Sequence, residues 1–117
     1  MWPLLADLPT TDDFEPEAAL AERAATPGLY LLFADGPEPV YVGQSRNIRV
    51  RLATHRREGK KVFHTARFYP VGSEQSRLIL ETVLIALLRP PLNRGLMLGI
   101  ADGRIWEIKW PGRKRKS

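Results

Sequence analysis

The stretch "GLYLLFADGPEPVYVGQSRNIRVRLATHRR", residues 28–57, decides the fold. Its first six residues are apolar or aromatic apart from the glycine, which predicts a buried strand over 28–33. The segment "ADGPEP" is rich in turn-forming residues, and "VYVG", residues 40–43, predicts the returning strand. Two strands so close together in sequence indicate an antiparallel hairpin. We expect a helix to follow from about Asn47 to Arg57, with Ser45 or Asn47 as its N-cap.

The chain beyond this stretch predicts one more strand and one more long helix. "TARFYPV", residues 65–71, alternates well enough for a third strand. "EQSRLILETVLIALL", residues 74–88, predicts a helix capped by Ser73, and because it is apolar on nearly every side we expect it to be buried. The predicted fold class is α/β, as an α+β sandwich. It has a short, three-stranded, mainly antiparallel sheet flanked by helices, and a C-terminal strand or hairpin is a further candidate element.

The two ends of the chain differ from this central part. Residues 1–26 form an acidic N-terminal extension, in which we expect a helix over 13–25 because Asp13, Pro16 and the Ala/Leu/Glu composition favour one. Residues 27–95 form the main domain, residues 96–110 a hairpin and residues 111–117 a basic tail. Trp106 and Trp110 fall on one face of the last expected strand, where they either pack on a core or stack on bases.

The charge of the chain is unevenly distributed. The formal net charge is +5, but residues 1–26 carry a balance of −5, so the remaining residues carry +10. A body this basic indicates a polyanionic partner such as nucleic acid, although solubility alone also accounts for it. The absence of cysteine excludes disulfides and thiolate metal sites. The sequence shows neither a membrane-length apolar run nor a secretion signal, so we expect a cytoplasmic protein.

Two residues of the basic helix differ from its other cations. With about 100° of rotation per residue, Ile48 and Leu52 mark the buried side, and Arg51 and His55 flank that stripe one turn apart. An arginine fixed at the edge of a core is pre-ordered for bidentate contact with a phosphate. It can equally cover the core edge with its aliphatic stem, and His55 can equally be a core-edge histidine.

Glu81 lies among apolar residues in the middle of the second predicted helix. A buried carboxylate is costly unless it is paired or bound to a metal. Two interpretations are open: an ion pair with Arg77, four residues earlier, or ligation of a hard divalent cation such as magnesium.

Tyr30 and Tyr41 occupy similar places on the two strands of the hairpin, so pairing of the strands can bring them together on one face. Two such tyrosines are often core residues. Near a metal and an arginine, however, a phenol loses its proton more easily and can act as a general base.

Taken together, these residues resemble the GIY-YIG nuclease family. Gly28-Leu29-Tyr30 resembles the first family motif and Tyr41-Val42-Gly43 the second. The helix that contains Arg51 is similar to the family's arginine helix. "LILETVLIALLRPPLN" places Glu81 and Asn93 where the family has its metal-binding glutamate and a following asparagine. The resemblance extends over residues 28–94 and implies that residues 27–95 are a nuclease domain.

The resemblance implies a metal-dependent endonuclease, a phosphodiesterase of class EC 3.1. Glu81 would be the sole protein ligand of one Mg²⁺ or Mn²⁺ ion. Tyr30 would take a proton from the attacking water, and Tyr41 would orient the water or the phosphate. Arg51 would stabilise charge in the transition state, and Asn93 would fix the geometry of the site.

Two positions set this chain apart within the family. Repair-type members have a lysine directly after the second motif, where this chain has Gln44. His55 resembles a histidine of restriction-type members. We infer that His55 accepts a proton from Tyr30 near neutral pH.

The remaining basic residues predict how DNA would be bound. We expect a phosphate track around the site, which the tail either extends or leaves alone. Without a recognition module, low sequence specificity and a preference for single-stranded or structured DNA are expected; RNA is not excluded, and the protein would be a monomer or transient dimer. The alternative functions are a non-catalytic nucleic-acid-binding module and a nuclease subunit of a larger complex. The track comprises Gln44, Arg46, Arg49, Arg56, Arg57, Lys60, Lys61 and Arg67.

Overall fold

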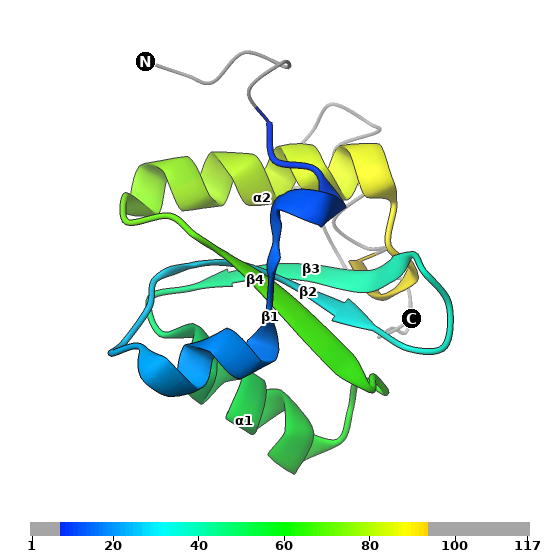
Figure 1. The fold of residues 1–117 in the computed structure, drawn as a ribbon. Helices are drawn as coiled ribbons and strands as arrows, with labels where there is room; N and C mark the ends of the chain where they lie inside the picture. Colours follow the sequence, from blue (N-terminus) through cyan, green and yellow to red (C-terminus); the bar gives the residue numbers. More distant parts are fainter. Residues whose placement is uncertain (1–7, 94–117) are drawn as a thin grey trace.

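A four-stranded antiparallel sheet in the order β1-β4-β2-β3 forms the centre of the computed structural model, which describes residues 8–93. The apolar run of 28–33 became the inner strand β2, paired on both edges (Figure 1). Along the chain the elements are η2 (Thr11–Asp13), β1 (Glu15–Pro16), η3 (Glu17–Glu22), β2 (Gly28–Phe33), β3 (Pro39–Ser45), α1 (Ile48–Glu58), β4 (Thr65–Pro70), α2 (Glu74–Leu88) and η4 (Pro91–Asn93).

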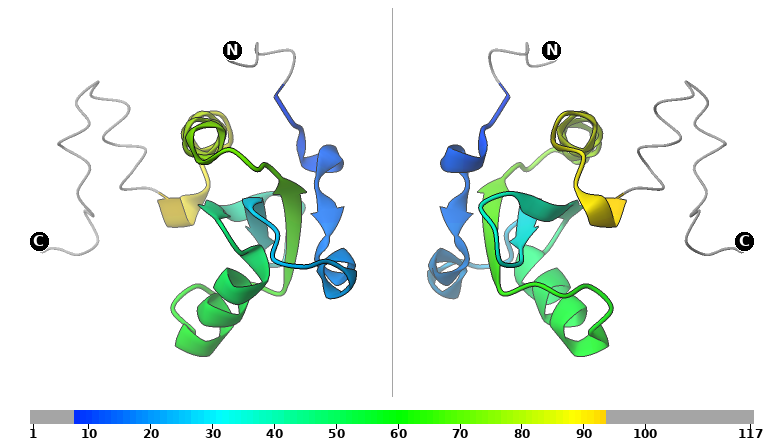
Figure 2. Two further views of the ribbon diagram at one scale, coloured as in Figure 1. Left: turned by 90° about the vertical axis from the view of Figure 1, so that its left-hand side faces the viewer. Right: turned by 90° about the vertical axis from the view of Figure 1, so that its right-hand side faces the viewer.

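The sheet lies between two helical layers. The long helix α2 covers one face, and α1 covers the other together with η3 (Figure 2). Successive residues of β2 point to opposite faces, so Leu29, Leu31 and Phe33 pack in the core beneath α2, whereas Tyr30 and Leu32 pack in the core beneath α1. Every residue of β2 is therefore buried, which explains why this strand is apolar throughout instead of alternating.

The predicted hairpin is confirmed. Strand β3 pairs antiparallel with β2 from Gly28 opposite Ser45 to Leu32 opposite Tyr41, with an irregularity between Leu32 and Phe33. The fold class is also confirmed, because helices flank an antiparallel sheet on both faces.

Both long helices begin where the sequence predicts. The Asn47 side chain accepts a hydrogen bond of 3.3 Å from the Val50 amide at the start of α1, so Asn47 and not Ser45 is the cap. Ser73 caps α2 in the same way, accepting from the Ser76 amide at 3.2 Å. Helix α1 ends at Glu58 and is capped by Gly59, whose positive φ of 67° suits glycine at this position.

The single helix predicted over residues 13–25 is wrong. Two short 3-10 helices, η2 and η3, and the short strand β1 occupy this region instead. Phe14 belongs to the core beneath α2, and Leu20 belongs to the core beneath α1. The chain must cross the edge of the sheet between them, and extended backbone at Glu15–Pro16 makes that crossing. Tertiary burial of two side chains on opposite faces thus overrides the local helix preference.

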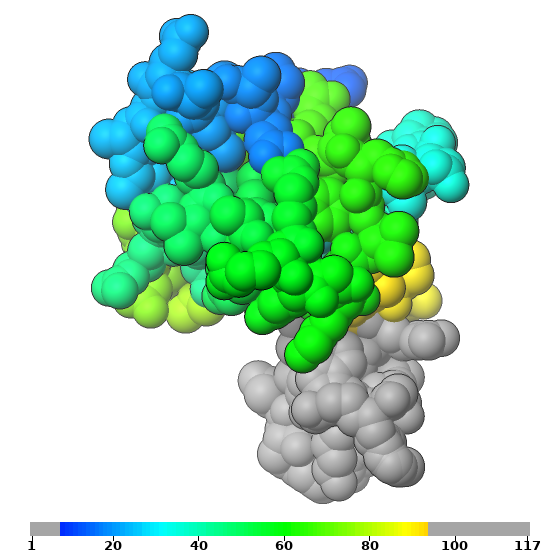
Figure 3. All heavy atoms as spheres, turned by 90° about the horizontal axis from the view of Figure 1, so that it is seen from below, coloured from blue at the N-terminus to red at the C-terminus, as the bar shows by residue number. Residues whose placement is uncertain are grey.

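The crossing adds a strand to the three that we predicted. Strand β1 pairs with β4, with Glu15 opposite Phe68 and Pro16 opposite Arg67. The Arg67 guanidinium donates to the Phe14 carbonyl from both Nε (3.0 Å) and Nη2 (2.7 Å). Seen from the α1 side, the N-terminal segment lies directly against α1 (Figure 3).

Helix α2 is only partly buried, contrary to the expectation. Leu80, Leu84 and Ile85 face the sheet, but Leu78 and Leu87 are 45% and 60% exposed. Two apolar side chains of α2, on different sides of the helix, thus remain exposed among the described residues. None of the helices among residues 8–93 has both the length and the apolarity that a bilayer crossing requires. The expected hairpin of 96–110, Trp106 and Trp110, and the tail of 111–117 lie outside the described residues.

Candidate active site

A tyrosine and a histidine meet between β2 and α1. The Tyr30 hydroxyl lies 2.8 Å from His55 Nε2, at hydrogen-bonding distance. Both side chains are buried, at 1% and 7% exposure. Tyr30 points to the α1 side because of the alternation along β2, and His55 follows Leu52 on the buried side of α1. His55 thus lies buried beside the core beneath α1, and its hydrogen-bond partner there is the Tyr30 side chain.

Tyr41 completes an aromatic group with this pair. Its ring centroid lies 6.1 Å from that of Tyr30 and 5.6 Å from that of His55. Strand pairing thus brings the two tyrosines together, as the sequence predicts. Lys61 adds a cation to this group, with Nζ 4.8 Å from the centroid of the Tyr41 ring.

The glycines beside the two tyrosines provide space. Gly43 lies opposite Tyr30, and a Cβ at this position would come within 2.4 Å of the Tyr30 Cζ and hydroxyl oxygen. A Cβ at Gly28 would come within 2.3 Å of the Tyr69 carbonyl on β4. Any larger residue at either position would displace a strand or the Tyr30 ring, which explains the glycine in each motif.

Asn93 fixes the edge of β3 next to Tyr41 and Gly43. Its Oδ1 accepts from the Val42 amide at 2.9 Å, and its Nδ2 donates to the Val42 carbonyl at 3.0 Å. The asparagine side chain, 3% exposed, thereby imitates one residue of a neighbouring strand. These two hydrogen bonds hold the backbone of β3 in place between Tyr41 and Gly43.

Glu81 has no ion-pair partner within the described part of the chain. The pairing with Arg77 that we considered is absent, because Arg77 donates to Gln44 and to the carbonyls of Val71 and Gly72. Burial raises the pKa of Glu81 from 4.5 to about 7, and the charge of Arg51 opposes that rise.

A divalent cation suits this carboxylate. A half-buried carboxylate of raised pKa, without an ion-pair partner among residues 8–93, is a site where an added positive charge is favourable. No group of three or more potential ligands from His, Asp or Glu occurs among residues 8–93. An ion at Glu81 would therefore take its other ligands from water and substrate, a ligand set that Mg²⁺ accepts.

The electrostatic surroundings keep both kinds of ring neutral near pH 7. Burial raises the pKa of Tyr30 and of Tyr41 above the ordinary value; Glu81 raises both further, whereas Arg51 lowers both. Burial is the main cause that lowers the pKa of His55, and the positive charges of Lys61 and Arg51 lower this pKa further. The charges of Arg51 and Glu81 are thus near enough to both tyrosines to influence their ionisation.

Three arginines of the expected phosphate track bind the N-terminal segment instead. Arg49 donates to the carbonyls of Leu20 and Arg23, and Arg67 donates to that of Phe14. Arg56 forms a bidentate ion pair with Glu17, at 2.6 and 2.8 Å. No local sequence pattern indicates these contacts, because they depend on where the crossing segment runs.

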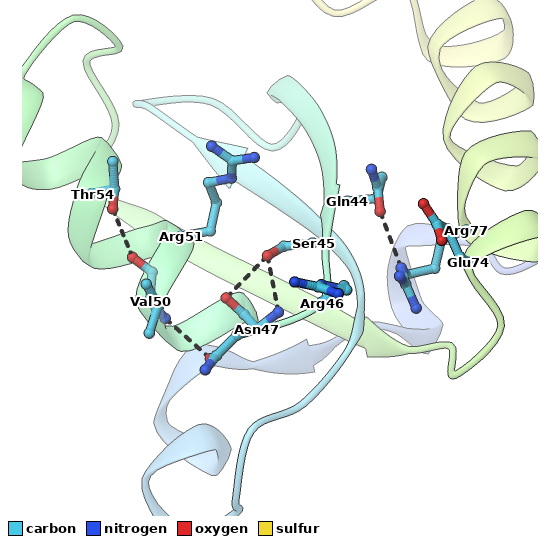
Figure 4. Close-up of a pocket in the computed structure, with 9 residues that line it drawn as sticks. All are labelled: Gln44, Ser45, Arg46, Asn47, Val50, Arg51, Thr54, Glu74 and Arg77. Atoms are coloured by element: carbon cyan, nitrogen blue, oxygen red, sulfur yellow. Dashed lines mark hydrogen bonds between the residues drawn. The ribbon is translucent and has the colours of Figure 1, made fainter.

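Other members of the track lie elsewhere. Arg57 and Lys60 are exposed at the C-terminal end of α1. Arg46 and Arg51 line a pocket of about 420 Å³ together with Gln44 and Arg77 (Figure 4). Arg77 is the residue that sequence reasoning missed as a potential binding group; it was considered only as a partner of Glu81.

No family model matches this chain. The chain is similar to UvrABC system protein C of Pseudomonas protegens, with 33% identity, and to that of Pseudomonas savastanoi pv. phaseolicola, with 35% identity; each match covers 71% of this chain. The same protein of Nitrobacter winogradskyi is 31% identical over 66% of this chain. The matched region is only 15%, 15% and 12% of the length of these relatives, whose N-terminal domain is of GIY-YIG type. From this similarity and from the arrangement of Tyr30, Tyr41, Arg51, Glu81 and Asn93, we conclude that the chain belongs to the GIY-YIG nuclease family.

Proposed function

We propose that this protein is a metal-dependent endonuclease that hydrolyses phosphodiester bonds in DNA. The main support is the 2.8 Å contact between the Tyr30 hydroxyl and His55 Nε2. A buried phenol in contact with a neutral imidazole has a route for its proton, and such a route is what activation of a water requires. Family membership supports the same conclusion.

Tyr30 and His55 act as a proton relay in this proposal. Because the pKa of Tyr30 is raised, a free phenolate is not populated near neutral pH. The phenol therefore passes its proton to Nε2 of a His55 tautomer protonated at Nδ1, while its oxygen takes a proton from the attacking water. The hydroxide formed in this step attacks phosphorus, and the bond to the leaving oxygen breaks. His55 ends the step as an imidazolium and returns the proton to solvent or to the leaving oxygen.

Arg51 stabilises the negative charge that develops on the phosphate. It is exposed, and none of the carboxylates that the structure describes lies within ion-pair distance of it. The guanidinium is therefore free to bind phosphate oxygens with two parallel hydrogen bonds. Tyr41, half-buried beside the same site, orients the water or the phosphate.

Glu81 would hold one Mg²⁺ or Mn²⁺ ion. When bound, the ion supplies positive charge at the phosphate and at the leaving oxygen. Glu81 must be ionised to bind it, and its raised pKa makes proton and metal compete for the carboxylate. Asn93 keeps β3, and with it Tyr41, in register with the rest of the site.

The substrate and the setting are parts of the same proposal. With no recognition module among the described residues, we expect low sequence specificity and activity on single-stranded or structured DNA. A second candidate is a nuclease module that acts within a larger assembly. The comparisons favour it to this extent: the chain spans about 15% of the length of the Pseudomonas relatives.

The test is to incubate supercoiled plasmid, labelled single strands and a branched duplex with the protein and MgCl₂, MnCl₂ or EDTA. We expect cutting that needs metal and that disappears in Glu81→Ala, with Glu22→Ala, an exposed carboxylate on η3, as the matched control. Failure to cut any substrate with either metal would reject the proposal. Binding without cutting would favour the non-catalytic module.

A further inference from the structure

Arg77 is a buried cation without a counter-ion in the described part of the chain. Its side chain is 2% exposed. Its Nε donates to Gln44 Oε1 at 3.0 Å, and its Nη1 donates to the carbonyls of Val71 (3.2 Å) and Gly72 (2.9 Å). These acceptors are all neutral, and Nη2 has no acceptor among residues 8–93. A buried positive charge whose acceptors are all neutral is costly unless an anion pairs with it.

The guanidinium borders the pocket of about 420 Å³ between the end of β3, α1 and the start of α2. Arg46 and Arg51 line the same pocket, and Figure 4 shows Arg46 between Arg51 on α1 and Arg77 on α2. The lining residues include these three arginines and one carboxylate, Glu74, so the lining has a net charge of +2. Glu74 is exposed and lies outside ion-pair distance of the three.

Gln44 determines how Arg77 is presented. It anchors the guanidinium through Nε, and Nη2 has no acceptor among the described residues; because Gln44 is uncharged, it does not neutralise the arginine. A carboxylate at this position would anchor Arg77 equally well but would remove the positive charge from the pocket. The neutral anchor and the unpaired cation together indicate a site for an external anion.

The position of Arg51 links the pocket to the active site. Arg51 lines the pocket, and its charge also acts on both tyrosines and on Glu81. An anion in the pocket therefore lies next to the reacting phosphate. Successive phosphates of one DNA strand are the anions that meet this condition.

We propose that the pocket between Arg46, Arg51 and Arg77 binds the backbone phosphate next to the one that is cut, and so sets the position of the strand. This inference rests on the proposed nuclease function. Gln44 is a positioning residue, and Arg46 and Arg77 are binding residues.

The first experiment measures anion binding without any cleavage. The Tm of the full chain is followed against inorganic phosphate, with chloride adjusted to keep the ionic strength constant. Wild type is stabilised saturably, because a ligand that binds only the folded state raises its stability. Arg46→Met, at an exposed position, loses most of this rise. Arg89→Met, the same change at the exposed C-cap of α2, keeps it.

Gln44→Glu distinguishes binding from a merely structural role of Arg77. The new carboxylate pairs with Arg77, so we expect a Tm without phosphate that is equal or higher and a phosphate response that is lost. If Arg77 only stabilises the fold, Gln44→Glu and wild type respond equally to phosphate, and the inference is overturned. Equal responses in all four proteins would overturn it as well and would indicate an adventitious ion only.

The second experiment locates the phosphate on the substrate. Single neutral methylphosphonates are placed along a labelled strand, and kcat/KM is measured for wild type and Arg46→Met. We expect a methylphosphonate at one position beside the cut to lower kcat/KM of wild type by about 10- to 100-fold, the usual effect of losing a hydrogen bond to a charged group. The same methylphosphonate should lower kcat/KM of Arg46→Met much less, because the variant already lacks that contact. Cutting without such a position refutes this inference alone. A chain that binds phosphate but never cuts refutes the proposed function, and with it the assignment to a substrate strand.

Discussion

At the scale of single residues, we expect the contact between Tyr30 and His55 to determine how the proposed activity depends on pH. The pKa of His55 lies below its ordinary value of 6.5, chiefly because the ring is buried. The imidazole is therefore neutral, and able to accept a proton, down to a lower pH than a free histidine. The pair is poised in its neutral form across the neutral range.

We expect kcat, at saturating metal, to fall only as the pH drops below 6.5 through the lowered pKa of His55. His55→Ala should lower kcat by about 100- to 10,000-fold, which is the usual contribution of a positioned general base. The same substitution should also abolish the fall of kcat at acidic pH. Single-turnover rates of both proteins between pH 5 and 9 check this, and an unchanged profile with an unchanged rate would contradict the relay.

Glu81 makes the stability of the protein depend on pH in the other direction: stability should fall as the pH rises, whereas the proposed activity should fall as the pH drops. Its pKa is about 7 in the folded protein and near 4.5 when unfolded, so the folded state binds the proton more tightly. The contribution of this group to stability is thus greatest below pH 4.5 and is lost as the pH rises to about 7. Without metal, Glu81→Gln should be more stable than wild type at pH 8, by up to about 3 kcal/mol.

The same pair of proteins should be nearly equal in stability at pH 4, where Glu81 is protonated in both states. Urea unfolding in EDTA at the two pH values provides the measurement. Addition of Mg²⁺ at pH 8 should then stabilise wild type alone. A variant that is less stable at pH 8 would show that the carboxylate has a partner.

Arg77 shows where residue-level prediction from the sequence stops. An arginine four residues before a buried glutamate predicts an ion pair, since helical neighbours at this spacing can meet. The side chain turns instead toward Gln44 and the carbonyls before α2. That choice depends on where β3 ends relative to α2, which no local pattern specifies.

At the scale of elements, the hairpin, α1, β4 and α2 were predictable because their signals are local. Turn residues separate β2 from β3, and Asn47 and Ser73 cap the helices. The N-terminal segment was not predictable, because its Ala/Leu/Glu composition favours a helix while Phe14 and Leu20 must reach opposite faces of the sheet. The crossing is a tertiary requirement.

Asn93 connects η4 to β3, and its loss should loosen that strand. We expect Asn93→Ala to destabilise the protein by about 1–3 kcal/mol, because the buried amide and carbonyl of Val42 lose their partners. Hydrogen exchange should accelerate at the Val42 amide far more than at Leu31, which faces it on β2. Equal protection in both proteins would mean that water replaces the side chain at no cost.

At the scale of the whole molecule, the N-terminal segment is part of the folded domain. It contributes a strand, and Phe14 and Leu20 from this segment enter both cores. Three arginines of α1 and β4 bind it, although the sequence had suggested them for DNA. Fewer basic residues of the expected track are therefore left for a nucleic acid, among them Arg46 and Arg51, which line one pocket.

We expect the burial of this segment, and not its ion pairs, to matter for stability. Phe14→Ala should cost about 3–5 kcal/mol, the range typical of a buried phenylalanine. Glu17→Ala should cost less than about 1 kcal/mol, because its pair with Arg56 is largely exposed. Chemical denaturation of both variants gives the comparison, and equal losses would contradict it.

The pairing of Asn93 with Val42 has one more consequence, which concerns contacts between molecules. Among residues 8–93, β3 is the outermost strand on its side of the sheet. An exposed edge of this kind can recruit a strand from a neighbouring molecule and start aggregation. The amide and carbonyl of Val42 are already used by a side chain, so an incoming backbone finds neither donor nor acceptor at this residue. The asparagine that holds β3 beside the candidate site thereby also blocks strand addition at Val42.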